Sequence, residues 1–156
     1  ESLFCKNDHT MENLKFLIRI IIFTIGMLLF TGCGEIEPML ELQLEKQAIE
    51  EPFTFADYCK KEYDTIFLVY PYFNTERENF VNLKMSDRLR GICNANINFD
   101  HFSTILFIKN GKVEAYSEIQ CVNADFDSRE VEKHYIFPID QKFIMDKERK
   151  IHIYDE

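Results

Sequence analysis

A β-hairpin signature between Ser103 and Cys121 restricts the possible folds of this chain more than any other feature. Two β-prone runs, STILFIK and VEAYSEIQC, flank Asn110-Gly111, and Asn-Gly is the preferred pair for a two-residue hairpin turn. Such a turn sets the expected register, with the pairs Lys109–Lys112, Ile108–Val113, Leu106–Ala115 and Ile105–Tyr116. The sequence therefore predicts a long antiparallel strand pair.

The two faces of this hairpin are expected to differ. One predicted face is almost entirely apolar or small, and we expect it to pack on helices: Thr104, Leu106, Ile108, Val113, Ala115, Ser117 and Ile119. The other is mixed and is expected to be half exposed: Ile105, Phe107, Glu114, Tyr116 and Glu118. Alternation of this kind is typical of a sheet with one covered face.

Shorter elements are expected on either side of the hairpin. Three helices are predicted. The first covers 54–63, the second begins at a capping box at Thr75-Glu76-Arg77-Glu78, and the third runs from Ser86-Asp87 to a stop at Gly91. Strands are predicted at 65–70, 135–137 and 143–145, with an edge strand at 151–154, while 125–133 reads as a loop or one helical turn. This order predicts an α+β domain: a mostly antiparallel sheet with one or two short helices packed on one face.

The N-terminal part of the chain is expected to be a targeting segment. Residues 16–30 read FLIRIIIFTIGMLLF, and the uncharged run from Ile20 to Phe30 follows Lys15 and Arg19. A membrane-spanning helix needs about 20 apolar residues, whereas the apolar region of a secretory signal needs roughly 7 to 15. A transmembrane anchor or a buried core helix are the alternatives to a secretory signal.

The end of this run, Leu29-Phe30-Thr31-Gly32-Cys33, resembles the lipobox of bacterial lipoproteins, although Phe30 and Thr31 replace the usual residues. The resemblance implies that Cys33 is acylated, becomes the first mature residue and holds the protein to a membrane of the bacterial cell envelope. Gly34 in place of a retention signal favours the outer membrane. The implied division is an upstream extension before Met11 (1–10), a lipoprotein signal peptide (11–32), an acidic tether (33–52) and a single α+β domain (53–156).

The charge of the chain disfavours nucleic acid as a partner. The 18 basic and 27 acidic residues give a formal net charge of −9, and an acidic protein repels phosphate backbones. The same charge would repel anionic head groups, so we expect membrane attachment to come from the lipid on Cys33.

Cysteine and histidine spacing gives no metal site. Cys59, Cys93 and Cys121 remain after the leader; they are either small buried apolar residues or one disulfide plus a thiol. Neither they nor His101, His134 and His152 have zinc-ligand spacing. We therefore expect no metal and no cofactor.

No coherent catalytic set is visible, so a non-enzymatic interaction module is the favoured function. The alternative is a small envelope hydrolase whose site is assembled by folding around His101. The expected interaction surface consists of aromatic residues that could contact an envelope protein: Tyr70, Tyr72, Phe73 and Tyr116. The stretch from Asp64 to Tyr72, followed by the hairpin, is similar to small bacterial envelope proteins of unassigned function; that resemblance implies a type of domain and no activity.

Overall fold

The computed structural model describes residues 36–154. The expected extension (1–10), signal peptide (11–32) and acylated Cys33 lie outside the described residues. The described residues, 36–154, belong to one compact unit. None of the helices in the described part of the chain is both long and apolar enough to cross a bilayer.

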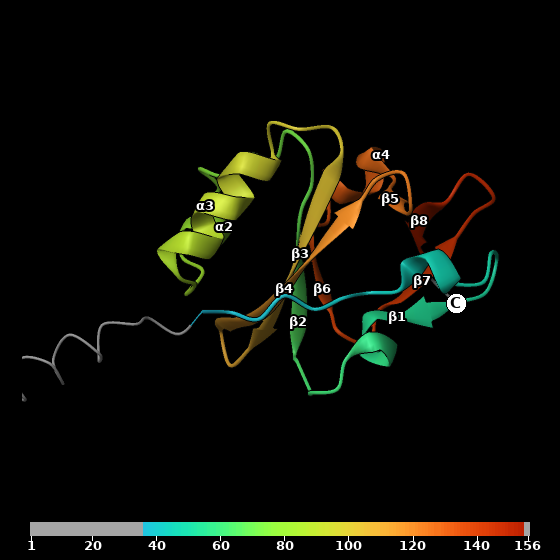
Figure 1. Cartoon of the computed structure of the whole chain (residues 1–156), viewed down its shortest axis with the longest axis horizontal. Helices are drawn as coiled ribbons and strands as arrows, with labels where there is room; N and C mark the ends of the chain where they lie inside the picture. The colour runs from blue at the N-terminus through green and yellow to red at the C-terminus, as the bar shows by residue number, and fades with distance from the viewer. Residues whose placement is uncertain (1–35, 155–156) are drawn as a thin grey trace, which may run out of the picture. The chain divides into compact units, whose positions relative to one another are not determined.

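Two four-stranded sheets form the body of this unit (Figure 1). The first sheet is fully antiparallel and has the order β4 (Lys112–Gln120), β3 (Phe102–Lys109), β2 (Thr65–Val69), β6 (Ile136–Pro138). The second has the order β1 (Phe53–Thr54), β7 (Lys142–Met145), β8 (Lys150–Ile153), β5 (Asp125–Phe126), and only its β5–β8 pair is parallel. The prediction of mostly antiparallel pairing is confirmed, but the strands divide into two sheets and not one, and the described residues are mostly β, which is compatible with the predicted α+β class although helices are few.

The helices within residues 36–154 are few and short. They are α2 (Glu78–Val81), α3 (Asp87–Asn96) and α4 (Ser128–Val131), with 3-10 turns η1 (Leu44–Lys46) and η2 (Phe55–Tyr58). In Figure 1, α2 and α3 lie on one side of the first sheet and the second sheet lies on the other. The first sheet is therefore covered on both faces.

Strand β2 illustrates this double burial. Phe67 packs on Phe80 of α2, with ring centroids 6.0 Å apart. Its neighbour Ile66 pairs with Phe137 of β6, and the Phe137 ring lies 5.4 Å from that of Phe143 in the second sheet. Successive side chains thus enter two separate packed layers, which explains why the run has no polar alternation.

The hairpin forms as predicted at its turn, but not along its length. Lys109–Lys112 and Ile108–Val113 pair as expected, and beyond them a β-bulge places Phe107 opposite Ala115 and Leu106 opposite Tyr116. The predicted pairs Leu106–Ala115 and Ile105–Tyr116 are therefore wrong by one residue. The cause is Glu114, the extra residue of the bulged strand.

The bulge also corrects the predicted faces. Ile105 and Phe107 now share a face with Ser117 and Ala115, and both are fully buried and not half exposed. The opposite face of β4 turns toward α3, where Asn96 donates to Glu118. A one-residue slip exchanges the faces of a strand, because side chains alternate with a period of two.

Several predicted boundaries need correction. The expected helix at 54–63 is the single turn η2 following β1, with the Asp57 carboxylate accepting from the Thr54 backbone N–H at 2.8 Å. Helix α2 is preceded by Arg77 and not by Thr75. Ser86 does cap α3, but the helix continues past Gly91 to Asn96.

The C-terminal strand is not an edge strand. Strand β8 lies between β7 and β5, and the β5 partner comes from 125–126, inside the stretch expected to be a loop or a helical turn. A two-residue parallel pairing leaves no periodic pattern in the sequence, so it could not be predicted.

Several residues of the segment expected to be an acidic tether pack on the domain. Leu44 is 2% exposed and belongs to the core. Residues 38–40 bond to β4, where the Leu40 N–H donates to the Tyr116 carbonyl at 2.7 Å. This contact covers the free edge of the first sheet, which would otherwise expose unpaired backbone groups.

Candidate functional site

The candidate site lies where three strands of the first sheet end. Because these strands are antiparallel neighbours, the end of β2, the start of β3 and the end of β4 lie at the same end of the sheet. The Tyr72 N–H donates to the Ile97 carbonyl at 2.9 Å, and the Cys121 N–H donates to the His101 carbonyl at 2.9 Å. These two bonds draw together the loops that follow β2, precede β3 and follow β4.

A cavity of about 520 Å³ opens among these loops and α4, and we call it the loop-end cavity. Its size falls within the roughly 300–1,000 Å³ of small-ligand sites. Its lining includes Tyr70, Tyr72, Arg77, Asp100, Cys121, Asp125, Phe126, Ser128, Val131 and Glu132.

The aromatic part of the cavity combines a buried and an exposed tyrosine. Tyr70 is 9% exposed, and burial raises the pKa of its hydroxyl. Tyr72 is 74% exposed, and the Asp100 carboxylate beside its hydroxyl raises its pKa. Both phenols are therefore neutral near pH 7 and present a ring together with a polar tip.

Tyr72 is held in a left-handed backbone conformation, with φ of 62°. A non-glycine residue in this region is uncommon and usually marks a tight turn or a constrained site. In this loop it accompanies the bond from the Tyr72 N–H to Ile97, so the loop after β2 is tied to the loop before β3.

Arg77 brings one positive charge to the lining. Its guanidinium carbon lies 4.7 Å from the Tyr135 ring centroid and 5.3 Å from that of Phe73. Guanidinium groups stack favourably on aromatic faces. The Arg77 guanidinium is therefore stacked on the aromatic rings of Tyr135 and Phe73, next to the cavity that Arg77 lines.

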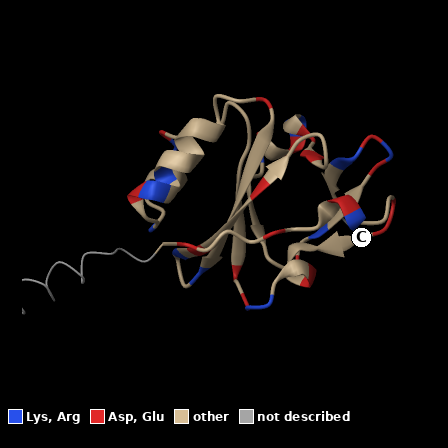
Figure 2. Ribbon diagram, in the orientation of Figure 1, with Lys and Arg blue, Asp and Glu red and all other residues tan. Residues whose placement is uncertain are grey.

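Three carboxylates also line the cavity, on Asp100, Asp125 and Glu132. Figure 2 shows acidic positions on the loop leading into β3 and around α4. Among the described residues that line the cavity, Arg77 is the only Lys or Arg. With a single arginine against three carboxylates, the cavity has a net negative charge at neutral pH.

Cys121 is the only thiol that the described part of the chain contributes to the lining, and it is poorly suited to nucleophilic chemistry. Burial, together with the nearby Asp125 carboxylate, raises its pKa to about 11. Since the thiolate is the nucleophile, a thiol of this pKa is almost entirely protonated at neutral pH. All three described cysteines, Cys59, Cys93 and Cys121, are free thiols in the structure.

His101 is not placed beside a nucleophile and a carboxylate, as the hydrolase alternative requires. It is exposed and does not contribute to the lining of the loop-end cavity. No hydrogen bond connects its ring to a described nucleophile or carboxylate. Within residues 36–154, no cluster of three or more His, Cys, Asp or Glu side chains is arranged to hold a metal ion.

The structure divides the four aromatic residues expected to form an interaction surface. Tyr70 and Tyr72 both line the loop-end cavity. Phe73 is 2% exposed and packs at the back of the cavity against Tyr70, Phe67 and Tyr135. Tyr116 is half buried on β4, where residues 38–40 cover its backbone, so it belongs to another part of the surface.

The polar members of the cavity were missed by reasoning from sequence. Asp100 lies three residues before the predicted hairpin, and Cys121 ends it. Antiparallel pairing with β2 would have placed both beside Tyr70, so strand order was the signal that could have found them. Strand order gives no information on Arg77 and Glu132, because Arg77 directly precedes α2 and Glu132 directly follows α4.

The chain was compared with protein-family models, with curated proteins and with solved structures, and none of these gave a match.

Proposed function

We propose that this protein is a lipid-anchored component of the bacterial cell envelope that acts as a non-enzymatic interaction module. Its loop-end cavity binds an exposed segment of another envelope protein, in which a basic side chain lies next to an apolar one. The observation that carries the proposal is the cavity itself, which combines tyrosine rings with an excess of carboxylates.

The surroundings of the cavity support a macromolecular partner. Besides Tyr72, the exposed apolar residues Phe99 and Val122 lie on two of the loops that frame it. Exposed apolar side chains gathered near a pocket favour an interaction site over an isolated small-ligand site. The protonated Cys121 thiol and the outlying His101 give the hydrolase alternative no comparable support.

The anchoring part of the proposal depends on the lipobox-like sequence at Cys33. Only Gly34 and Glu35 would separate an acylated Cys33 from Ile36, and an extended chain spans at most about 3.6 Å per residue. A lipid at this position would therefore keep the folded unit close to the bilayer surface.

Ligand-observed and protein-observed NMR would test the binding part with two matched probes. Phenethylamine carries a ring and an ammonium group, whereas 3-phenylpropanoate carries a ring and a carboxylate. We expect phenethylamine to shift the resonances of residues lining the cavity, and we expect Asp125→Asn to weaken that effect. Asp140→Asn, at an exposed position outside the lining, is the matched control.

Equal shifts with both probes, or no shifts in the cavity with phenethylamine, would refute the proposed ligand chemistry. The anchor is tested separately by metabolic palmitate labelling in a bacterial host, with Cys5→Ala as the control. Labelling that persists in Cys33→Ala would refute acylation at Cys33.

A further inference from the structure

Helix α4 forms part of the wall of the loop-end cavity, and it depends on other elements for its position. Ser128, Val131 and the following Glu132 line the cavity. With four residues, α4 is far shorter than a helix that is stable by its own backbone bonds. Contacts with the rest of the domain must therefore hold this wall in place.

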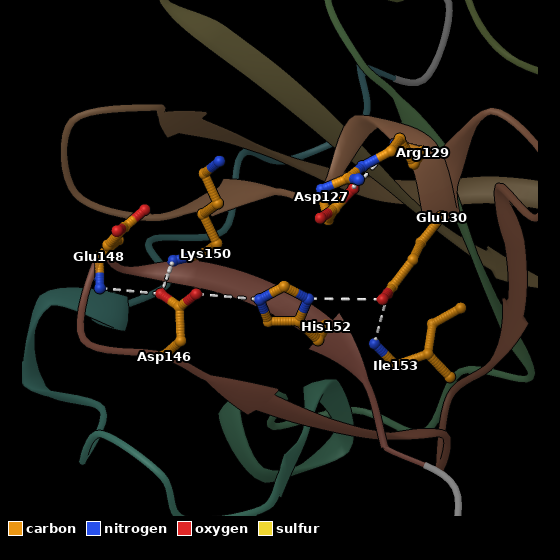
Figure 3. A network of polar contacts seen from close by, with 8 residues as sticks. All are labelled: Asp127, Arg129, Glu130, Asp146, Glu148, Lys150, His152 and Ile153. Atoms are coloured by element: carbon orange, nitrogen blue, oxygen red, sulfur yellow. Dashed lines mark hydrogen bonds and ion pairs between the residues drawn. The ribbon is translucent and has the colours of Figure 1, made fainter.

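One of these contacts runs from Glu130 of α4 to strand β8 (Figure 3). The Glu130 Oε2 atom accepts the Ile153 N–H at 2.8 Å. The Glu130 Oε1 atom lies 3.4 Å from Nδ1 of His152. A single carboxylate thus joins α4 to both the backbone and the imidazole ring of β8.

The opposite nitrogen of the same ring faces a second carboxylate. His152 Nε2 lies 3.0 Å from Asp146 Oδ2 in the turn between β7 and β8. Asp146 is itself held by the backbone N–H groups of Glu148 and Lys150, which donate to Oδ1 at 2.9 and 2.8 Å. Figure 3 shows the ring between the two carboxylates, which come from different elements.

This arrangement is satisfied only when the ring is protonated. An imidazolium has two N–H donors, whereas a neutral imidazole has one donor and one lone pair. Loss of the proton would leave a lone pair facing a carboxylate on one side of the ring. The bond to Asp146 raises the pKa of His152, and the bond to Glu130 adds to this effect against the opposing influence of partial burial.

The other charged groups around the ring come from α4 and β8. Asp127 caps α4, and the hydrogen bond from the Arg129 N–H is the main cause that lowers its pKa. The charges of His152 and Lys150 lower this pKa further. Arg129 also pairs with Asp127, at 3.6 Å. Arg129 and Lys150 thus share the Asp127 carboxylate, while the ring itself contacts the two carboxylates of Glu130 and Asp146, which favour its charged form.

We infer that His152 is a protonation-dependent clamp that holds α4, and with it one wall of the loop-end cavity, against β8. The idea that this clamp regulates ligand binding in the cavity rests on the proposed binding function. Protonation of His152 closes the clamp, and its deprotonation as pH rises loosens α4.

The sign of the pH effect follows from the raised pKa. Stability from a group whose folded pKa exceeds its unfolded value, about 6.5 for histidine, is fully present below that unfolded value. It is lost as pH rises through the folded pKa of His152. The loosening of α4 should therefore occur above about pH 6.5.

Hydrogen exchange measured by NMR on the whole chain between pH 5.5 and 8.5 tests the clamp without a ligand. After correction for intrinsic exchange rates, we expect protection of the Val131 and Glu132 amides to fall roughly three- to tenfold as the His152 ring titrates, as for the loss of one charge-assisted hydrogen bond. His152→Gln should abolish this dependence, while His101→Gln, at an exposed position outside the network, should keep it.

Unchanged protection of α4 across the His152 titration, or an equal fall in His152→Gln, would overturn the inference. If His152→Gln does not fold, Glu130→Gln provides the same test, since its amide oxygen can still accept from Ile153 but no longer favours the imidazolium. Phenethylamine binding that weakens over the same pH range would support the regulatory meaning. A pH-dependent α4 without phenethylamine binding at any pH would refute the proposed function and leave the clamp standing.

Discussion

Truncation of Leu44 tests whether the segment after the proposed lipid site is part of the folded unit. The Leu44 side chain is 2% exposed within the core, and Arg149 Nη2 donates to its backbone carbonyl at 2.7 Å. Replacing a buried leucine by alanine costs about 2–5 kcal/mol, because transfer free energy is lost and a cavity remains. For Leu44→Ala we expect a loss of about 3 kcal/mol in the free energy of unfolding.

Thermal and urea unfolding followed by circular dichroism would measure this loss. In a domain of this size, 1 kcal/mol corresponds to roughly 4 °C, so the midpoint should fall by about 12 °C. Ile49→Ala is the matched control, because Ile49 lies in the same segment but is 43% exposed; its cost should stay below about 1 kcal/mol. Equal effects of the two substitutions would show that residues 36–52 act as a tether and would refute the packing described above.

Three further predictions concern α3 and the thiols. Gly91→Ala should raise the free energy of unfolding by about 0.5–1 kcal/mol in urea titrations, because Gly91 lies inside α3 and an added Cβ would meet nothing within 4 Å; a destabilised variant would contradict this placement. Ser86→Ala should lower it by about 1–2 kcal/mol, since the hydroxyl accepts the Leu89 N–H at 3.2 Å and donates to Glu37 Oε2 at 2.5 Å, and an unchanged midpoint would argue against the cap. Burial raises the pKa values of Cys59 and Cys121 to about 11, so at pH 8 iodoacetamide should modify them roughly 100-fold more slowly than an ordinary thiol. Peptide mass spectrometry should find that Cys93, with a pKa of about 12, is also protected. A disulfide found without reductant would contradict the three free thiols.

The parts of the fold that could be predicted are those governed by local chemistry. Asn110-Gly111 sets its turn because both residues accept a positive φ, observed as 51° and 73°. Ser86 caps α3 because its hydroxyl reaches a backbone N–H three residues ahead. The run at 65–70 required a strand buried on both faces, and β2 is one.

The missed features have non-local causes. Next to the bulge at Glu114, the Val113 N–H donates to the carbonyl of Lys84, which is distant in sequence, and nothing in VEAYSEIQC marks the bulge. Gly91 reads as a helix stop, but Leu89 and Cys93 on either side of it are buried, and this packing carries α3 onward. The expected surface residue Phe73 is buried because Phe67, Phe80 and Tyr135 surround its ring.

The candidate site shows the same division. From sequence, Tyr70 and Tyr72 could be placed at the end of a strand, since hydrophobic runs and proline punctuation are read locally. Only the order of the strands and the position of α4 bring Asp100, Asp125 and Glu132 around them. Local bonding preferences act over a few residues and can be read from the chain, whereas a cavity and a carboxylate-flanked histidine exist only once packing has joined segments far apart in sequence.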